Sequence, residues 1–179
     1  MYVWIACDLS EALADTRAAC IEYNKALGLS EVAFSLPQHL SLKISFEVPD
    51  NKVNHVIDAV SRLLSLAPRF EVDGPTPNIF GSILWLRFTE NKMLKKLHDT
   101  LDRMLKEEFG IPQHEFDLDF KYHSTLFIDG NISKLQIMYR KLVSLTVPKK
   151  IVIDKFLVGT SKSGKMGEYA VNRIINAKM

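Results

Sequence analysis

The sequence predicts an α+β fold in which the second half of the chain repeats the element order of the first. Short apolar runs of strand length alternate with segments of helical periodicity along the 179 residues. In each half the order is strand, helix, histidine-bearing strand, helix, strand. The histidine strands begin at His39 and His123, and Trp4 and Trp85 lie on the strands that open the two halves. Such a repeat places equivalent strands opposite one another across a shared groove.

The first half is predicted to contain two helices between its strands. Ser10 caps the first helix, and Gly28 ends it because glycine readily adopts the left-handed conformation at a helix C-terminus. Pro49 and Asp50 end the histidine strand and open the second helix, which Pro68 closes. The expected strands cover 2–7, 32–36, 39–46 and 70–73, and the expected helices cover 10–27 and 53–64.

A turn-rich connector, Gly74-Pro75-Thr76-Pro77-Asn78, is the expected boundary between two lobes. We therefore expect one bilobal domain over residues 1–179, with lobes of roughly 1–78 and 79–179. A basic, glycine-containing loop over 160–165 precedes the last strand and is expected to close the groove. In the second half the expected strands cover 83–86, 123–128, 151–159 and 168–171, and the expected helices cover 91–109 and 131–145.

Each histidine strand carries an imidazole and a hydroxyl on the same face. His39 is followed two positions later by Ser41, and His123 by Thr125. On a strand, positions i and i+2 point to the same side, about 7 Å apart. The alternation continues in the first strand, which places a polar row toward the groove and an apolar row toward the core. The polar row is His39, Ser41, Lys43 and Ser45, and the apolar row is Leu40, Leu42, Ile44 and Phe46.

Other interpretations of the histidines are disfavoured by their neighbours. A third match, His98-Asp99-Thr100, lies in a helical pattern, where positions i and i+2 do not face each other. Neither histidine strand offers an acidic residue on the histidine face, as a metal site would need. A Ser–His nucleophile is also disfavoured, because Ser41 and Thr125 lack the glycines of a nucleophile elbow. We therefore expect neither a metal nor a cofactor.

Two opposed histidines suit proton transfer at a phosphorus centre. With an ordinary pKa near 6.5, one imidazole can accept a proton from water while the other donates one to the leaving oxygen. Ser41 and Thr125 would hold the non-bridging phosphate oxygens, and Lys43 would add a cation on the same face. Which of His39 and His123 is the base depends on the orientation of the substrate.

Composition excludes several classes of protein. The balance of 23 basic and 21 acidic residues gives a net charge of +2, which disfavours long duplex nucleic acid as a partner. Cys7 and Cys20 are expected to be buried free thiols, which suits the cytoplasm. The apolar start of the chain reads as a strand rather than a signal peptide, and no run is long enough for a membrane span. We expect a monomer.

The two motifs, His39-Leu40-Ser41-Leu42 and His123-Ser124-Thr125-Leu126, together with the half-repeats, resemble those of the two-histidine (2H) phosphoesterase superfamily. That superfamily includes 2′-5′ RNA ligase-like proteins and cyclic phosphodiesterases. The resemblance covers nearly the whole chain and implies two antiparallel sheets lining a central cleft, with helices outside. It implies His39 and His123 as the acid/base pair, Ser41 and Thr125 as phosphate holders, and metal-independent chemistry on 2′,3′-cyclic phosphates or 2′-5′ linkages. Tyr169 matches a position where such proteins often carry an aromatic residue.

Two departures narrow the expected substrate. An arginine often follows the second motif in the RNA ligase-like proteins, whereas Phe127-Ile128-Asp129 follows here, and Ser41 stands where threonine is commoner. We therefore expect hydrolysis of a small cyclic-phosphate nucleotide or of a cyclic phosphate at an RNA 3′ end. The alternatives are a 2′-5′ RNA ligase, an RNA 3′-end processing enzyme, and a nucleotide- or RNA-end-binding module without turnover. Tyr122 and His114 are further candidates for lining the cleft.

Overall fold

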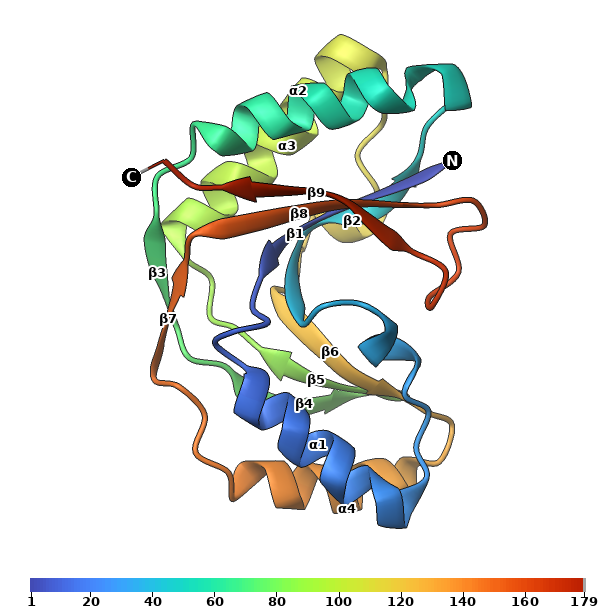
Figure 1. Cartoon of the computed structure of the whole chain (residues 1–179), viewed down its shortest axis with the longest axis vertical. Helices are drawn as coiled ribbons and strands as arrows, with labels where there is room; N and C mark the ends of the chain where they lie inside the picture. The colour runs from blue at the N-terminus through green and yellow to red at the C-terminus, as the bar shows by residue number, and fades with distance from the viewer. Residues whose placement is uncertain (179) are drawn as a thin grey trace.

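The computed structural model describes residues 1–178 and consists of α-helices and antiparallel sheets (Figure 1). The strands are β1 (Tyr2–Asp8), β2 (His39–Glu47), β3 (Phe70–Asp73), β4 (Thr76–Phe80), β5 (Ile83–Arg87), β6 (His123–Ile128), β7 (Lys150–Ile153), β8 (Lys155–Ser161) and β9 (Ala170–Asn176). The α-helices are α1 (Ala14–Leu27), α2 (Val53–Ser65), α3 (Lys92–Phe109) and α4 (Ile132–Val143). Short 3₁₀ turns are η1 (Val32–Ser35), η2 (Asp50–Lys52) and η3 (Glu115–Asp117).

Two larger sheets define two lobes. Sheet 1 has the order β2-β1-β8-β9, and α2 and α3 pack on it to form lobe 1. Sheet 2 has the order β4-β5-β6, and α4 packs on it with α1 beside α4, which forms lobe 2. Figure 1 shows the two helix pairs at opposite ends of the molecule with the sheets between them. β2 and β6, the two histidine strands, contact each other where the lobes meet.

The predicted repeat is present in the order β1-α1-β2-α2-β3 and β5-α3-β6-α4-β7. In both halves the opening strand pairs antiparallel with the histidine strand, β1 with β2 and β5 with β6. The last strands of the two repeats, β3 and β7, pair with each other in a small third sheet. The predicted pseudo-two-fold α+β architecture is therefore confirmed.

Helix ends follow local chemistry where the sequence carries a strong signal. The Asn91 side chain accepts hydrogen bonds from the backbone of Met93 and Leu94 and begins α3. Gly110, with φ 70°, ends that helix in the left-handed conformation that glycine adopts without steric cost. Gly28 ends α1 in the same way. Ser10 does not cap α1, because a turn intervenes and the helix begins at Ala14.

Three segments differ from their predicted structure. Residues 32–35 form the 3₁₀ turn η1 rather than a strand. The connector at 74–78 contains the start of β4, which tolerates Pro77 because β4 is an edge strand with β5 as its one partner in the sheet. The run 151–159 is two strands that separate at Asp154, since β7 pairs with β3 whereas β8 joins sheet 1.

The lobes are not the two halves of the sequence. Sheet 1 takes β1 and β2 from before residue 78 and β8 and β9 from after it, so the predicted division at 78 does not coincide with the sheets. The helices also cross over: α1 follows β1 of lobe 1 but packs in lobe 2, and α3 follows β5 of lobe 2 but packs in lobe 1. Within residues 1–178, every helix is too short or too polar to span a membrane.

Candidate active site

A cavity of about 300 Å³ lies between the two histidine strands. Sheet 1 provides one wall, sheet 2 provides another, and the β8–β9 loop and the η1 segment complete the rim. Its lining combines two imidazoles and several hydroxyls with large apolar side chains. The lining residues are Trp4, Ala33, Leu36, His39, Ser41, Lys43, Ile44, Ser45, Phe120, His123, Thr125, Gly164, Met166 and Tyr169.

Each of the two histidine rings is held by a hydrogen bond to a backbone carbonyl oxygen. The Nδ1 atom of His39 lies 2.8 Å from the carbonyl oxygen of Pro37, and Nδ1 of His123 lies 2.6 Å from that of Lys121. A carbonyl oxygen only accepts hydrogen bonds, so each Nδ1 carries the proton and each Nε2 is left with a free lone pair. In both cases the carbonyl belongs to the residue two positions earlier. The repeat therefore fixes the same tautomer at both positions.

A tryptophan from the neighbouring strand packs against each histidine. Trp4 on β1 meets the His39 ring edge-on, with ring centroids 4.6 Å apart. Trp85 on β5 meets the His123 ring at 4.3 Å, and it also stacks on Phe80. These apolar rings restrain the imidazoles and remove water from around them. The strands that open the two repeats, β1 and β5, thus each provide a tryptophan that packs on the histidine of the neighbouring strand.

Burial lowers the pKa of both histidines. The pKa of His39 falls from 6.5 to about 4, chiefly because burial disfavours the imidazolium; the carbonyl of Pro37 and the charge of Asp8 only partly oppose this, and the nearby His123 adds to it. The pKa of His123 is also lowered by burial, against the opposing hydrogen bond to Lys121. His39 is the more deeply buried of the two. Both rings are therefore neutral at neutral pH.

The hydroxyls of Ser41 and Thr125 line the cavity beside the histidines. Ser41 lies two positions after His39 on β2, and Thr125 two positions after His123 on β6, as the alternation predicts. Tyr169 also lines the cavity, just before β9, and its hydroxyl lies 2.5 Å from Oγ of Ser45. The predicted placement of these side chains is found in the structure, and their roles remain predictions.

Gln38 joins the two histidine strands directly, and sequence reasoning missed it. Its buried side chain donates from Nε2 to Oγ of Ser124 at 2.5 Å and to the carbonyl oxygen of Thr125 at 3.2 Å. Gln38 adjoins His39, and Ser124 adjoins His123. This pair of hydrogen bonds therefore fixes how the two histidines lie relative to each other. Only the glutamine's position directly before the first motif could have signalled this role.

Lys43 does not lie in the polar row where the alternation placed it. The β1–β2 register shifts between Val3 and Ile5 and again between Ile5 and Ala6, which marks bulges in β2. A bulge inserts an extra residue and turns the following side chains to the other face. Lys43 and Ile44 both border the cavity, but Lys43 is only 2% exposed and its ammonium faces two carboxylates, so the structure does not support the predicted phosphate contact by that ammonium.

The Lys43 ammonium is paired with two buried carboxylates. Its Nζ lies 2.6 Å from Oδ1 of Asp102 on α3 and 2.6 Å from Oδ2 of Asp117 on η3. The Asp117 carboxylate also accepts hydrogen bonds from the backbone of Ile44 and His114. We call Lys43, Asp102, Asp117 and the adjacent His98 the buried ion cluster. It joins the histidine strand to α3 and to the loop before β6.

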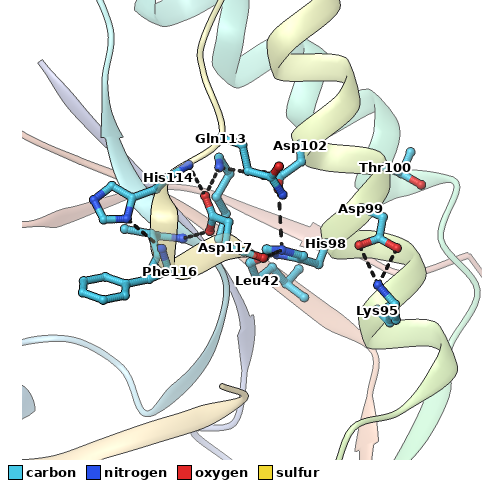
Figure 2. Close-up of polar contacts among 12 residues, drawn as sticks. Leu42, Lys95, His98, Asp99, Thr100, Asp102, Gln113, His114, Phe116 and Asp117 are labelled. Atoms are coloured by element: carbon cyan, nitrogen blue, oxygen red, sulfur yellow. Dashed lines mark hydrogen bonds and ion pairs between the residues drawn. The ribbon is translucent and has the colours of Figure 1, made fainter. Parts of the chain in front are cut away.

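Figure 2 shows the α3 side of this cluster, where Asp102 and Asp117 lie beside His98, Gln113 reaches Asp102, and the ring of His114 points away. The ring of His98 lies between two carbonyl oxygens, with Nδ1 2.7 Å from that of Leu42 and Nε2 3.1 Å from that of Asp117. Thr100 lies away from His98, on the outer side of the helix (Figure 2), which agrees with excluding the third histidine match. His98, Asp102 and Asp117 are close enough to share a metal ion, but the Lys43 ammonium already contacts both carboxylates.

Two further candidates lie outside the cavity. Tyr122 is buried in the hydrophobic core, with its ring against Phe120, because β6 begins one residue later. His114 is exposed on the loop before η3, where its Nδ1 accepts a hydrogen bond from the backbone of Phe116. The prediction that they line the cleft is therefore wrong. Cys7 and Cys20 are free and buried, as predicted.

Solved structures of similar fold cover nearly the whole chain. A protein described as a phosphoesterase has 18% identity and a TM-score of 0.67 over 99% of this chain and 98% of its own. TT0787 of Thermus thermophilus has 19% identity and a TM-score of 0.63, over 98% and 97%. LigT of E. coli, solved with 3′-AMP, has 18% identity and a TM-score of 0.60, over 99% and 98%. Neither a protein-family model nor a curated protein sequence matches the chain.

These likenesses establish the class of fold, that of the 2H phosphoesterases. More particularly, the chain has the LigT-like arrangement of four helices and antiparallel sheets. The resemblance inferred from the two histidine motifs is thus confirmed at the level of the fold.

Proposed function

We propose that this chain is, as a single bilobal domain, a metal-independent phosphoesterase that hydrolyses 2′,3′-cyclic phosphates. One observation supports this proposal above all: two imidazoles with the same tautomer and free Nε2 atoms line one cavity with two hydroxyls. A second support is that LigT, which shares the fold, has been solved with 3′-AMP, a mononucleotide of the kind this reaction would release.

In the proposed reaction His39 is the general base and His123 the general acid. Nε2 of neutral His39 takes a proton from water as its oxygen attacks phosphorus, and protonated His123 gives its proton to the leaving ribose oxygen as the P–O bond breaks. The assignment is supported by the deeper burial of His39, which keeps that ring neutral. Ser41 and Thr125 donate hydrogen bonds to the non-bridging oxygens. The product is a 2′- or 3′-phosphate, and exchange with solvent resets the two histidines.

The first test is hydrolysis of the four nucleoside 2′,3′-cyclic monophosphates in the presence of EDTA. We expect turnover that EDTA does not change, because no step uses a metal ion. Chromatography of the products identifies which ribose oxygen leaves. Nucleotide binding without turnover of any of the four would contradict the proposal and favour a binding module.

The same assay separates the RNA alternatives. Turnover of only RNA 3′ ends, or joining of RNA through a 2′-5′ linkage, would point to 3′-end processing or ligation. Contacts to an RNA backbone make affinity fall steeply with salt, whereas a small substrate shows a weak dependence. A salt series on the RNA and mononucleotide substrates therefore distinguishes the two classes.

The pH dependence follows from the two lowered histidine pKa values. The reactive form needs neutral His39 and protonated His123, so kcat/KM should fall below about pH 4, where His39 gains its proton. It should also fall on the alkaline side with a midpoint below 6.5, where His123 loses its proton. We expect the optimum of kcat/KM between these limits. A profile that stays flat up to pH 8 would contradict this assignment.

The profile of kcat provides an internal comparison. A bound phosphate anion stabilises the imidazolium of His123 and raises its pKa in the complex. The alkaline limb of kcat should therefore lie at higher pH than that of kcat/KM. Coincident limbs would show that the bound phosphate does not approach His123.

A further inference from the structure

The cavity of the proposed site has an unusual charge balance for a phosphate site. Among the described residues that line it, Lys43 is the one lysine or arginine, and none is acidic. The ammonium of Lys43 lies 2.6 Å from each of two buried carboxylates, so its charge is already compensated. The exposed part of its side chain is 2%. Within the described part of the chain, the residues that line the cavity therefore present no free lysine or arginine charge to a ligand. Arg87, which pairs with His123 in the β5–β6 ladder, is exposed and is not among the lining residues.

Before a ligand binds, the histidines do not supply this charge at neutral pH, and a bound phosphate that protonates His123 gains one positive charge, which balances a monoanion but not a dianion. Burial keeps His39 and His123 neutral there, and Asp8, which pairs with His39 in the β1–β2 ladder, contributes a nearby negative charge. The remaining polar groups are the uncharged hydroxyls of Ser41, Thr125 and Tyr169. Apolar walls complete the cavity, formed by Trp4, Leu36, Ile44, Phe120 and Met166.

Lysines near the rim do not change this balance. Nζ of Lys121 lies 2.7 Å from the carboxylate of Asp119. Lys162 and Lys165 are exposed on the β8–β9 loop and do not line the cavity, although Gly164 and Met166 of the same loop do.

We propose that this cavity selects singly charged phosphodiesters and disfavours doubly charged phosphate monoesters, including the product of its own reaction. This inference rests on the proposed function. Hydroxyl dipoles can solvate one diffuse negative charge, but a second charge moved from water into an apolar site is costly without a cation. A phosphate monoester is mostly a dianion at pH 7, because its second pKa is about 6. Hydrolysis therefore turns a well-held monoanion into a poorly held dianion, which favours product release.

The test compares two ligands that differ in charge and in one methyl group. They are a 2′-deoxynucleoside 3′-(methyl phosphate), which is a monoanion without the 2′-hydroxyl needed for cyclisation, and the corresponding 2′-deoxynucleoside 3′-phosphate. Their dissociation constants are measured by calorimetry at pH 7.5. We expect the diester to bind at least fivefold more tightly. Tighter binding of the monoester would overturn the proposal.

A single substitution should weaken the preference. Met166 lines the cavity but is 46% exposed, so it tolerates a polar replacement. In Met166→Lys a cation at the rim should tighten monoester binding roughly tenfold, as expected for an ion pair in a partly screened site. Met166→Gln has a similar length without the charge and should leave the order unchanged. Equal effects of the two substitutions would contradict a preference set by charge.

Hydrolysis of the cyclic phosphates, measured on the same samples, separates this proposal from the proposed function. If the cyclic phosphates are hydrolysed but the monoester binds more tightly than the diester, the proposed function is supported and the proposed charge selection is wrong. Failure of both ligands to bind at millimolar concentration also overturns the charge selection, and absence of hydrolysis would then remove the proposed function as well.

Discussion

Replacing His39 or His123 by alanine is expected to lower kcat/KM for 2′,3′-cyclic nucleotides by about 10²–10⁴-fold each. Each variant removes one of the two proton transfers and leaves the hydroxyls and the cavity in place. The double variant should lose less than the product of the two single losses, because residues that act as a unit are not additive. Initial rates under substrate-limited conditions give these ratios directly.

Two controls separate loss of chemistry from loss of structure. His55→Ala changes an exposed histidine on α2, outside the cavity, and should keep the activity of the unmodified chain. Added imidazole should restore part of the activity of His39→Ala and His123→Ala, because it can enter the space left by the ring and transfer the proton. Full activity in either alanine variant would remove the paired-histidine mechanism.

Replacing Lys43 by methionine should destabilise the fold by about 3–5 kcal/mol, the usual cost of removing one partner from a buried ion pair. The reason is that the carboxylates of Asp102 and Asp117 would remain buried without their cation. Denaturant unfolding of the variant and the unmodified chain measures the difference. Lys150→Ala is the matched control, since Lys150 pairs with Asp73 at the same 2.6 Å but on the exposed surface, and it should unfold almost like the unmodified chain.

A compensating variant tests the electrostatic cause. Lys43→Met/Asp102→Asn/Asp117→Asn removes the cation together with both anions and should regain much of the lost stability. If Lys43→Met instead abolishes activity at unchanged stability, Lys43 contacts the substrate after all, and the charge selection proposed for the cavity fails with it.

The histidine pair could be predicted from the sequence because its signal is local. The motif spacing fixes which side chains share a strand face, and the repeat fixes which strands oppose each other. The ends of α3 were likewise encoded locally, in Asn91 and Gly110. These features need no knowledge of a distant partner.

Features that depend on a partner strand or a distant loop could not be predicted. The position of Lys43 is decided by bulges in its pairing with β1, and nothing within the histidine strand itself records that register. Its two acidic partners lie on α3 and η3, well separated in the sequence. The role of Gln38 was missed for the same reason, because its side chain bonds to Ser124 of the other lobe.

The exchange of helices between the lobes has a consequence for folding. Because α1 packs in lobe 2 and α3 in lobe 1, neither lobe can be completed from one continuous stretch of chain. Contacts that join distant segments require loops to close before they stabilise anything, which slows folding. A cut at residue 78 would divide sheet 1 between the two fragments and would separate α1 from α4. The molecule should therefore unfold in one cooperative transition. His39 and His123 should leave their native positions in that same transition.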